Sequence, residues 1–140
     1  MLSRDYIAGL VDGEGSFCVF IRRPAKSTWK TRVECHFYVK MREDELLLLT
    51  MVRNFFGCGR ISFQKEYRRN QRDNYRYQVS NVKDLNTVII PFFEKNTLYS
   101  TPRRKDFGLF KKIVALVNTK AHKTKRGLAT IQQLKSRMHR

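Results

Sequence analysis

Apolar residues recur along this chain at two different spacings, and each change of spacing marks a boundary between predicted elements. Ser3 can cap a helix that runs to about Gly13, where the apolar positions follow a helical period. Apolar and polar residues then alternate from Ser16 to Arg22 and again over 32–40, which predicts two strands around a turn at 24–30. This hairpin would have one apolar face and one polar, mostly basic face.

The same change of spacing is repeated in the middle of the chain. Acidic residues at 43–45 open a second helix, which Gly57 ends. Its buried side is predicted to consist of Leu46, Leu49, Val52 and Phe56. Two more strands follow, joined by a basic loop, and are predicted at 59–66 and 74–79. In the first of these strands, Ile61 and Phe63 would point inward.

The last third of the chain is predicted to be helical. A third helix begins at Asn81 and ends near Pro91, and a fourth runs from Thr101 to Val117. A basic linker at 120–126 leads to a short last helix. The resulting order, α-β-β-α-β-β-α plus C-terminal helices, predicts an α+β fold. We expect one domain over residues 1–140, with a core of about 2–119 and a C-terminal linker and helix of about 120–140.

The charge of the chain indicates what kind of partner it binds. Lys and Arg number 29 against 12 Asp and Glu, for a net charge of +17 that is spread along the chain. Such an excess indicates an anionic partner, nucleic acid first and an acidic membrane second. No apolar run approaches the roughly 20 residues of a membrane span. The three cysteines lack a CxxC spacing, which favours free thiols in a reducing compartment over a zinc site.

The most informative segment is residues 7–15, Ile-Ala-Gly-Leu-Val-Asp-Gly-Glu-Gly. Gly9 and Gly13 are four positions apart and share one helix face, where another backbone can approach closely. Asp12 and Glu14 would then lie at the seam between two packed helices, where carboxylates can hold a metal ion. The alternative interpretation is an amphipathic helix followed by a glycine-rich turn.

This segment closely resembles the motif that names the LAGLIDADG homing endonucleases. The flanking Tyr6, Ser16 and Phe17 fit the family as well, as do Phe55-Phe56-Gly57-Cys58-Gly59-Arg60-Ile61 and Ile90-Pro91-Phe92-Phe93-Glu94-Lys95. The resemblance covers roughly residues 2–117. It implies the LAGLIDADG fold, in which an antiparallel four-stranded sheet forms a DNA-binding saddle.

The resemblance also implies catalytic and metal-binding residues. Glu14 matches the acid that binds divalent metal against the scissile phosphates, although most members have Asp there; the Gly13 carbonyl would be a further ligand. The expected cofactor is Mg²⁺ or Mn²⁺. Lys95 fits a catalytic basic residue of the family. Met41 stands where many relatives have a Gln that positions water, so Lys40 or Arg42 is a candidate replacement.

One motif per chain implies a homodimer, because cutting both strands of a duplex needs two active centres. The dimer interface is expected at Ala8, Gly9, Asp12 and Gly13. The activity implied is metal-dependent phosphodiester hydrolysis that leaves short 3′ overhangs in a long pseudo-palindromic site. The residues predicted to contact double-stranded DNA from the polar face of the sheet are Arg22, Arg32, His36, Tyr38, Lys40, Arg60, Ser62, Gln64, Arg76 and Gln78.

Two other functions use the same fold and charge. An intron RNA maturase would bind RNA as partner, and a DNA-binding regulator would bind DNA without cutting it. Retention of Glu14 favours cleavage over both. Such genes are typically carried by introns or inteins, so we expect the protein inside the cell with the genome, in a bacterial or archaeal cytoplasm or an organelle, and not secreted or in a membrane.

Overall fold

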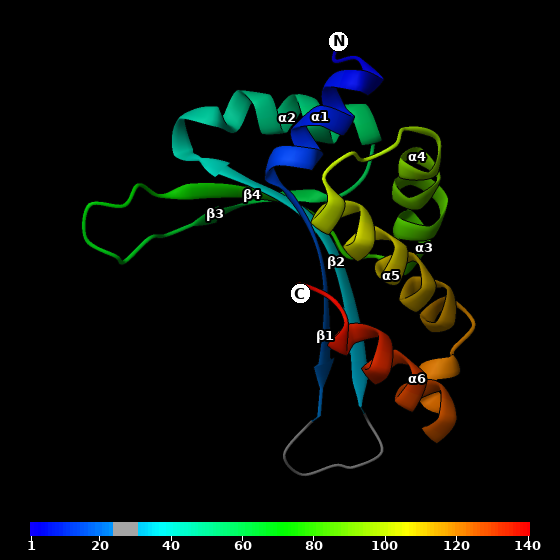
Figure 1. The fold of residues 1–140 in the computed structure, drawn as a ribbon. Coiled ribbons are helices and arrows are strands. Elements are labelled where there is room, and N and C mark those ends of the chain that lie inside the picture. Colours follow the sequence, from blue (N-terminus) through cyan, green and yellow to red (C-terminus); the bar gives the residue numbers. More distant parts are fainter. Residues whose placement is uncertain (24–30) are drawn as a thin grey trace.

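The computed structural model describes residues 1–23 and 31–140, so the turn predicted at 24–30 lies outside the described residues. Helices pack on one face of a four-stranded antiparallel sheet and leave the other face open (Figure 1). The first elements are α1 (Arg4–Glu14), β1 (Gly15–Arg22), β2 (Arg32–Arg42), η1 (Glu43–Glu45) and α2 (Leu46–Phe56). They are followed by β3 (Arg60–Gln64), β4 (Asn74–Val79), α3 (Val82–Asp84), η2 (Leu85–Ile89) and α4 (Ile90–Lys95). The last elements are α5 (Thr101–Asn118), η3 (Ala121–Lys123) and α6 (Lys125–Ser136). The predicted α+β fold is confirmed.

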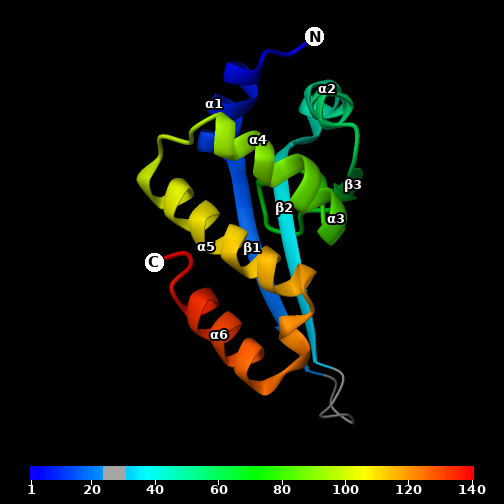
Figure 2. The ribbon, with the colours of Figure 1, turned by 90° about the vertical axis from the view of Figure 1, so that its right-hand side faces the viewer.

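The sheet has the strand order β1-β2-β4-β3 and is strongly twisted. In Figure 1, β1 and β2 run down the molecule, whereas the β3–β4 hairpin projects sideways as an arm. Figure 2 shows α5 and α6 lying along one side of β1 and β2. This arrangement leaves a concave, helix-free side between the arm and the β1–β2 hairpin, which is the saddle that the resemblance implies.

The core lies between the sheet and the helices and is rich in phenylalanine. Phe17 is central: its ring centroid lies 5.3 Å from that of Phe37 on β2 and 5.2 Å from that of Phe110 on α5. Phe93 of α4 also contacts both Phe17 and Phe37. Aromatic contacts of this kind add to the free energy of burying the rings. The predicted inward alternation of β1, β2 and β4 is confirmed by this packing.

The third predicted helix does not end near Pro91, and that prediction is wrong. The helix continues to Lys95 through a π-helical turn, in which the Ile90 N–H donates to the Leu85 carbonyl. Pro91 then lies in the first turn of α4, a position at which a helix tolerates the missing N–H of proline. The continuation carries Phe93 into the core and moves the end of the helix to Lys95.

Three smaller predictions also need correction. Phe63 is 50 % exposed and Leu46 is 39 % exposed, although both were expected to point inward. Phe63 belongs to the projecting arm, where no helix covers the sheet, and its ring packs against Tyr75. Leu46 begins α2 and lies beyond the edge of the core. The predicted linker at 120–126 is partly helical, because η3 and the first turn of α6 occupy it.

Candidate metal site and nucleic-acid interface

The motif helix α1 is anchored so that its last turn leads directly into β1. The Ser3 hydroxyl accepts a hydrogen bond from the Tyr6 N–H, and Ile7 and Val11 are fully buried. Gly15 joins helix to strand in a position where a Cβ atom would lie 2.6 Å from Cγ1 of Val11. Only glycine fits this close approach, so the end of α1 is held rigidly at the margin of the sheet.

Glu14 and Gly13 are exposed at the end of α1. Among the described residues, no group of three or more His, Cys, Asp or Glu side chains is close enough to hold a metal ion. A single chain therefore offers one carboxylate and one carbonyl at this point. These are hard oxygen donors that suit Mg²⁺ or Mn²⁺, and the remaining ligands would have to come from water, phosphate or a second acid.

Asp12 connects α1 to the start of α5. Its carboxylate accepts hydrogen bonds from the Tyr99 N–H, at 2.9 and 3.1 Å, and from the Ser100 N–H, at 3.2 Å. These N–H groups lie just before α5, where a helix favours negative charge. Within its own chain, Asp12 is thus a structural link and not a candidate metal ligand.

Replacing Asp12 by Ala should lower the free energy of unfolding by about 2 kcal/mol, because two peptide N–H groups lose a charged acceptor. Urea denaturation followed by circular dichroism measures this change. Asp12→Asn, which keeps one acceptor oxygen, serves as the matched control and should lose about half as much. Equal stability of Asp12→Ala and the parent would contradict the structural role.

Arg103 is a residue of this region that the sequence analysis missed. Its Nη2 lies 3.4 Å from the Asp12 carbonyl oxygen and 3.5 Å from the Gly13 carbonyl oxygen. The guanidinium therefore binds the negative end of the α1 dipole, next to the carbonyl that is predicted to bind metal. No sequence spacing links Arg103 to the motif, since the two are separated by 90 positions.

Lys95 ends α4 and is exposed. Figure 1 shows the chain leaving α4 and crossing to the end of α1 before α5 begins. This crossing contains Tyr99 and Ser100, which bind Asp12. The fold thus places Lys95 on a segment that leads to the motif, and its catalytic role stays a prediction.

The predicted DNA-contacting residues fall into rows across the open face of the sheet. Tyr38 of β2 pairs with Gln78 of β4, which in turn pairs with Arg60 of β3. A neighbouring row has the same construction and consists of Lys40, Arg76 and Ser62. Further members are Gln64, paired with Asn74, and Arg22, paired with Arg32. The register therefore brings all of the predicted residues to one face.

Arg76 is held flat against an aromatic ring within this face. Its guanidinium carbon lies 4.0 Å from the centroid of Tyr38, and its buried Nε has no hydrogen-bond partner among the described residues. Stacking of this kind stabilises a cation by about 0.5–2 kcal/mol and fixes its plane. The remaining guanidinium donors keep a fork geometry suited to guanine or phosphate.

A second part of the face is a continuous hydrogen-bond network. Glu34 accepts from Arg22 Nε at 3.1 Å and lies 3.5 Å from Nε2 of His36. The other ring nitrogen of His36 lies 2.6 Å from the Ser80 hydroxyl, to which Gln78 donates at 2.8 Å. Arg22 holds the pKa of Glu34 below its ordinary value, so this acid is ionised at neutral pH. Glu34 and Ser80 were not among the predicted site residues.

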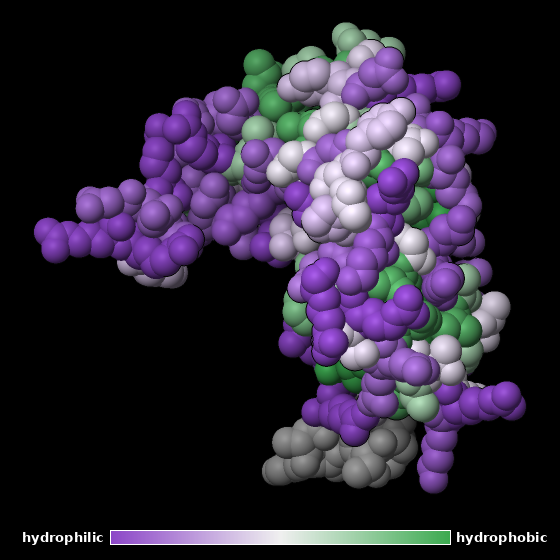
Figure 3. Space-filling model, in the orientation of Figure 1, coloured by the Kyte–Doolittle hydropathy of each residue, from purple (hydrophilic) through white to green (hydrophobic). Residues whose placement is uncertain are grey.

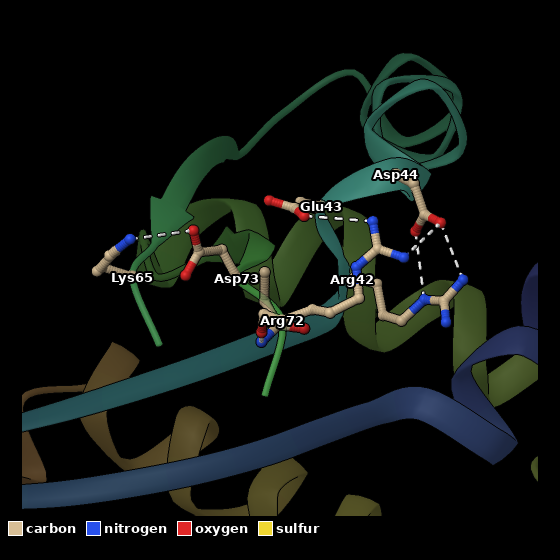
Figure 4. A network of polar contacts seen from close by, with 7 residues as sticks. Arg42, Glu43, Asp44, Lys65, Arg72 and Asp73 are labelled. Atoms are coloured by element: carbon tan, nitrogen blue, oxygen red, sulfur yellow. Dashed lines mark hydrogen bonds and ion pairs between the residues drawn. The ribbon is translucent and has the colours of Figure 1, made fainter. Parts of the chain in front are cut away.

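Ion pairs fix the loop end of the β3–β4 hairpin to the end of β2 (Figure 4). Arg42 donates to Asp44 at 2.9 Å, and Arg72 lies 3.3 Å from Glu43 and 3.6 Å from the same Asp44. Lys65 pairs with Asp73 at 3.4 Å on the facing strand ends. Arg42 is therefore engaged on the surface, which leaves Lys40 as the stronger candidate to replace the Gln expected at Met41.

The surface agrees with a nucleic-acid interface. Figure 3 shows that the arm is almost entirely hydrophilic, in contrast to the mixed surface over the helices. Of the described helices, none is both long and apolar enough to cross a membrane. A basic, polar concave sheet flanked by an exposed carboxylate is an arrangement that can bind a polyanion and place a metal ion against it.

Comparison with known proteins decides the family. Residues 7–114 match the sequence profile of the family described as LAGLIDADG endonuclease. The chain belongs to the LAGLIDADG endonuclease family. This LAGLIDADG chain is 35 % identical over 131 residues to the "Probable intron-encoded endonuclease 2" of Neurospora crassa. The match covers 93 % of the chain but 28 % of that relative.

Solved structures support both the family and the fold. I-SmaMI bound to cleaved DNA superposes on this LAGLIDADG chain with a TM-score of 0.88 and 33 % identity, over 100 % of the chain and 45 % of I-SmaMI. I-TnaI, a homing endonuclease, gives a TM-score of 0.84 and 30 % identity, over 99 % of the chain and 89 % of I-TnaI. The predicted LAGLIDADG fold is thereby confirmed.

Proposed function

We propose that this protein is a metal-dependent DNA endonuclease that acts as a homodimer and makes a double-strand break with short 3′ overhangs in a long pseudo-palindromic site. The observation that carries the proposal is the exposed Glu14 carboxylate, held at the end of the rigid motif helix beside a basic, in-register sheet face. The relative I-SmaMI was crystallised on uncleaved DNA with calcium and on cleaved DNA, which supports a DNA substrate.

Glu14 and the Gly13 carbonyl would hold the metal ion, Mg²⁺ or Mn²⁺. When bound, such an ion activates water and stabilises the departing 3′ oxygen. Glu14 orients this centre because Gly15 and Asp12 fix the end of α1. Lys95 would add positive charge beside the reacting phosphate. The products of hydrolysis are a 5′ phosphate and a 3′ hydroxyl.

The sheet face would lie in the major groove, which admits a β-ribbon and shows a distinct pattern for each base pair. Arg76, fixed by Tyr38, is suited to guanine, whereas Gln78 and Gln64 are suited to adenine. Other basic residues of the face would contact phosphates, which position the protein without selecting sequence.

The second active centre would come from a second copy of the chain. Gly9 and Gly13 are exposed, and a Cβ added at either would meet nothing within 4 Å. This bare glycine face of α1 allows the same face of another copy to approach closely, with Ala8 and Asp12 at its margin. The two Glu14 residues would then lie on either side of the dyad, facing two phosphates.

The decisive experiment is cleavage of a DNA library, or of the locus where an intron carrying the gene would insert, with Mg²⁺ and with EDTA. Discrete double-strand cuts that need Mg²⁺ and leave short 3′ overhangs would establish the activity. Tight binding of DNA without cleavage would favour a regulator. Tight binding of intron RNA without DNA cleavage would favour a maturase.

Glu34→Gln should increase DNA affinity about fivefold at low salt, because one negative charge leaves the face and Arg22 becomes available to phosphate. Fluorescence anisotropy with a labelled duplex measures the change. Glu94→Gln is the matched control: Glu94 is also paired with a base, Lys111, but lies in the helical layer. If both variants bind alike, Glu34 does not face the DNA.

A further inference from the structure

Arg103 places a fixed positive charge at the predicted metal ligand. Its Nη2 lies 3.5 Å from the Gly13 carbonyl oxygen, which directly precedes Glu14 in the chain. Its Nε is buried and has no acceptor among the described residues. Neither of these two nitrogens is paired with a carboxylate, so the guanidinium charge is not neutralised by an acid at this contact.

Arginine and metal can share the Gly13 carbonyl. A carbonyl oxygen has two lone pairs, and the long contact from Arg103 leaves one available. A metal ion held by that oxygen would lie within about 6 Å of Nη2 of Arg103, since metal–oxygen bonds are about 2–2.6 Å long. Even in water, charges of +1 and +2 at about 6 Å change an affinity about tenfold.

We propose that Arg103 is a positioning residue that couples metal binding to DNA binding. In the free protein its charge weakens the hold of Glu14 and Gly13 on a divalent ion. On DNA, the scissile phosphate brings negative charge next to both cations and offsets the repulsion. The proposal rests on the metal site of the proposed function, and it adds a reason for that site to fill only when substrate is present.

The test is a titration of the DNA-free protein with Mn²⁺, in which the unbound ion is followed by electron paramagnetic resonance. Arg103→Gln should bind Mn²⁺ about tenfold more tightly than the parent. Arg103→Met, which keeps the apolar stem of the side chain, is the second variant in case Gln disturbs the packing of α5 on α1. Arg103→Lys keeps the charge and should stay close to the parent.

Arg104→Gln is the matched control for removal of one positive charge. Arg104 is the next residue of α5 and is exposed. It lines a surface pocket together with Glu94 and Lys111, on the side of α5 that faces α4. Its Mn²⁺ affinity should equal that of the parent. Unchanged or weaker Mn²⁺ binding by the Arg103 variants would overturn the proposal, because a residue that only docks two helices has no reason to weaken metal binding.

Two further measurements locate the effect. The double variant Arg103→Gln/Glu14→Gln should lose the tighter Mn²⁺ binding that is expected of Arg103→Gln. If the tighter binding persists, the ion binds elsewhere and the proposal is overturned. The titration is then repeated on a target duplex whose scissile linkages cannot be hydrolysed. The difference in Mn²⁺ affinity between the parent and Arg103→Gln should be smaller there than without DNA. An equally large difference would show that Arg103 does not couple metal binding to DNA binding. Metal-dependent cleavage by the parent tests the proposed function separately, so either idea can fail alone.

Discussion

Glu14→Gln should reduce single-turnover cleavage of a target duplex about 1,000-fold, because the neutral amide loses the charge that holds the metal, a contribution of several kcal/mol. DNA binding should stay at the parental level or become slightly tighter, since one negative charge leaves the neighbourhood of the phosphates. The variant should fold normally, because Glu14 is exposed and terminates α1. Cleavage and anisotropy on the same labelled duplex measure both effects.

Glu14→Asp is the matched control, since it keeps the carboxylate and shortens its reach by one methylene. We expect it to retain metal-dependent cleavage within about 100-fold of the parent, the cost of a displacement of roughly 1 Å in an active centre. If Glu14→Gln cuts as well as the parent, another residue holds the metal. If Glu14→Gln and Glu14→Asp lose cleavage activity equally, the reach of the side chain and not its charge determines the cleavage rate.

Gly9→Leu should convert the proposed dimer into a monomer while leaving the subunit folded. The position is exposed, and a Cβ there meets nothing within 4 Å of the same chain. Leucine is a better helix former than glycine by up to about 1 kcal/mol, so thermal stability of the subunit should be kept or rise. In a symmetric interface the added side chain clashes twice, which should raise the dimer dissociation constant about 100-fold or more.

Sedimentation at micromolar concentration measures the loss of the dimer, and circular dichroism measures whether the subunit stays folded. Gly108→Ala is the control, because Gly108 is also a helical glycine with open space around its Cα but lies on α5. Its sedimentation should match that of the parent. If the parent protein is monomeric with and without DNA, the proposed homodimer is wrong. If Gly9→Leu is still a dimer, the dimer interface does not lie at the glycine face of α1.

Local patterns predicted most of the elements because each depends on near neighbours in sequence. The period of 2 in β1, β2 and β4 and the Ser3 cap of α1 were correctly identified for this reason. The start of α5 was predicted to within one residue, but its cap is Ser100 and not Thr101. The continuation through Pro91 was missed because a π-helical turn has no simple sequence signal. The alternation of apolar and polar residues predicts which side chains share a face of the sheet, but not whether a helix covers that face. Phe63 was predicted to lie in the core for this reason.

Long-range contacts limit what the sequence can predict about the site. Glu14 and Gly13 were found because the motif is contiguous. The contacts of Asp12 with Tyr99 and of Arg103 with the motif span 87 and 90 positions and depend on how α5 docks. Glu34 shares the predicted face, but its bond with Arg22 could be recognised only once the strand register was known.

The hydrogen-bond network on the sheet has a consequence for how such a protein acquires a new target. Glu34, His36, Ser80 and Gln78 bind one another, so substitutions at these positions should not have additive effects on DNA binding. Arg76 and Tyr38 form a separate stacked pair. Evolution or design would therefore have to change two residues together at the stacked pair, but four together at the network.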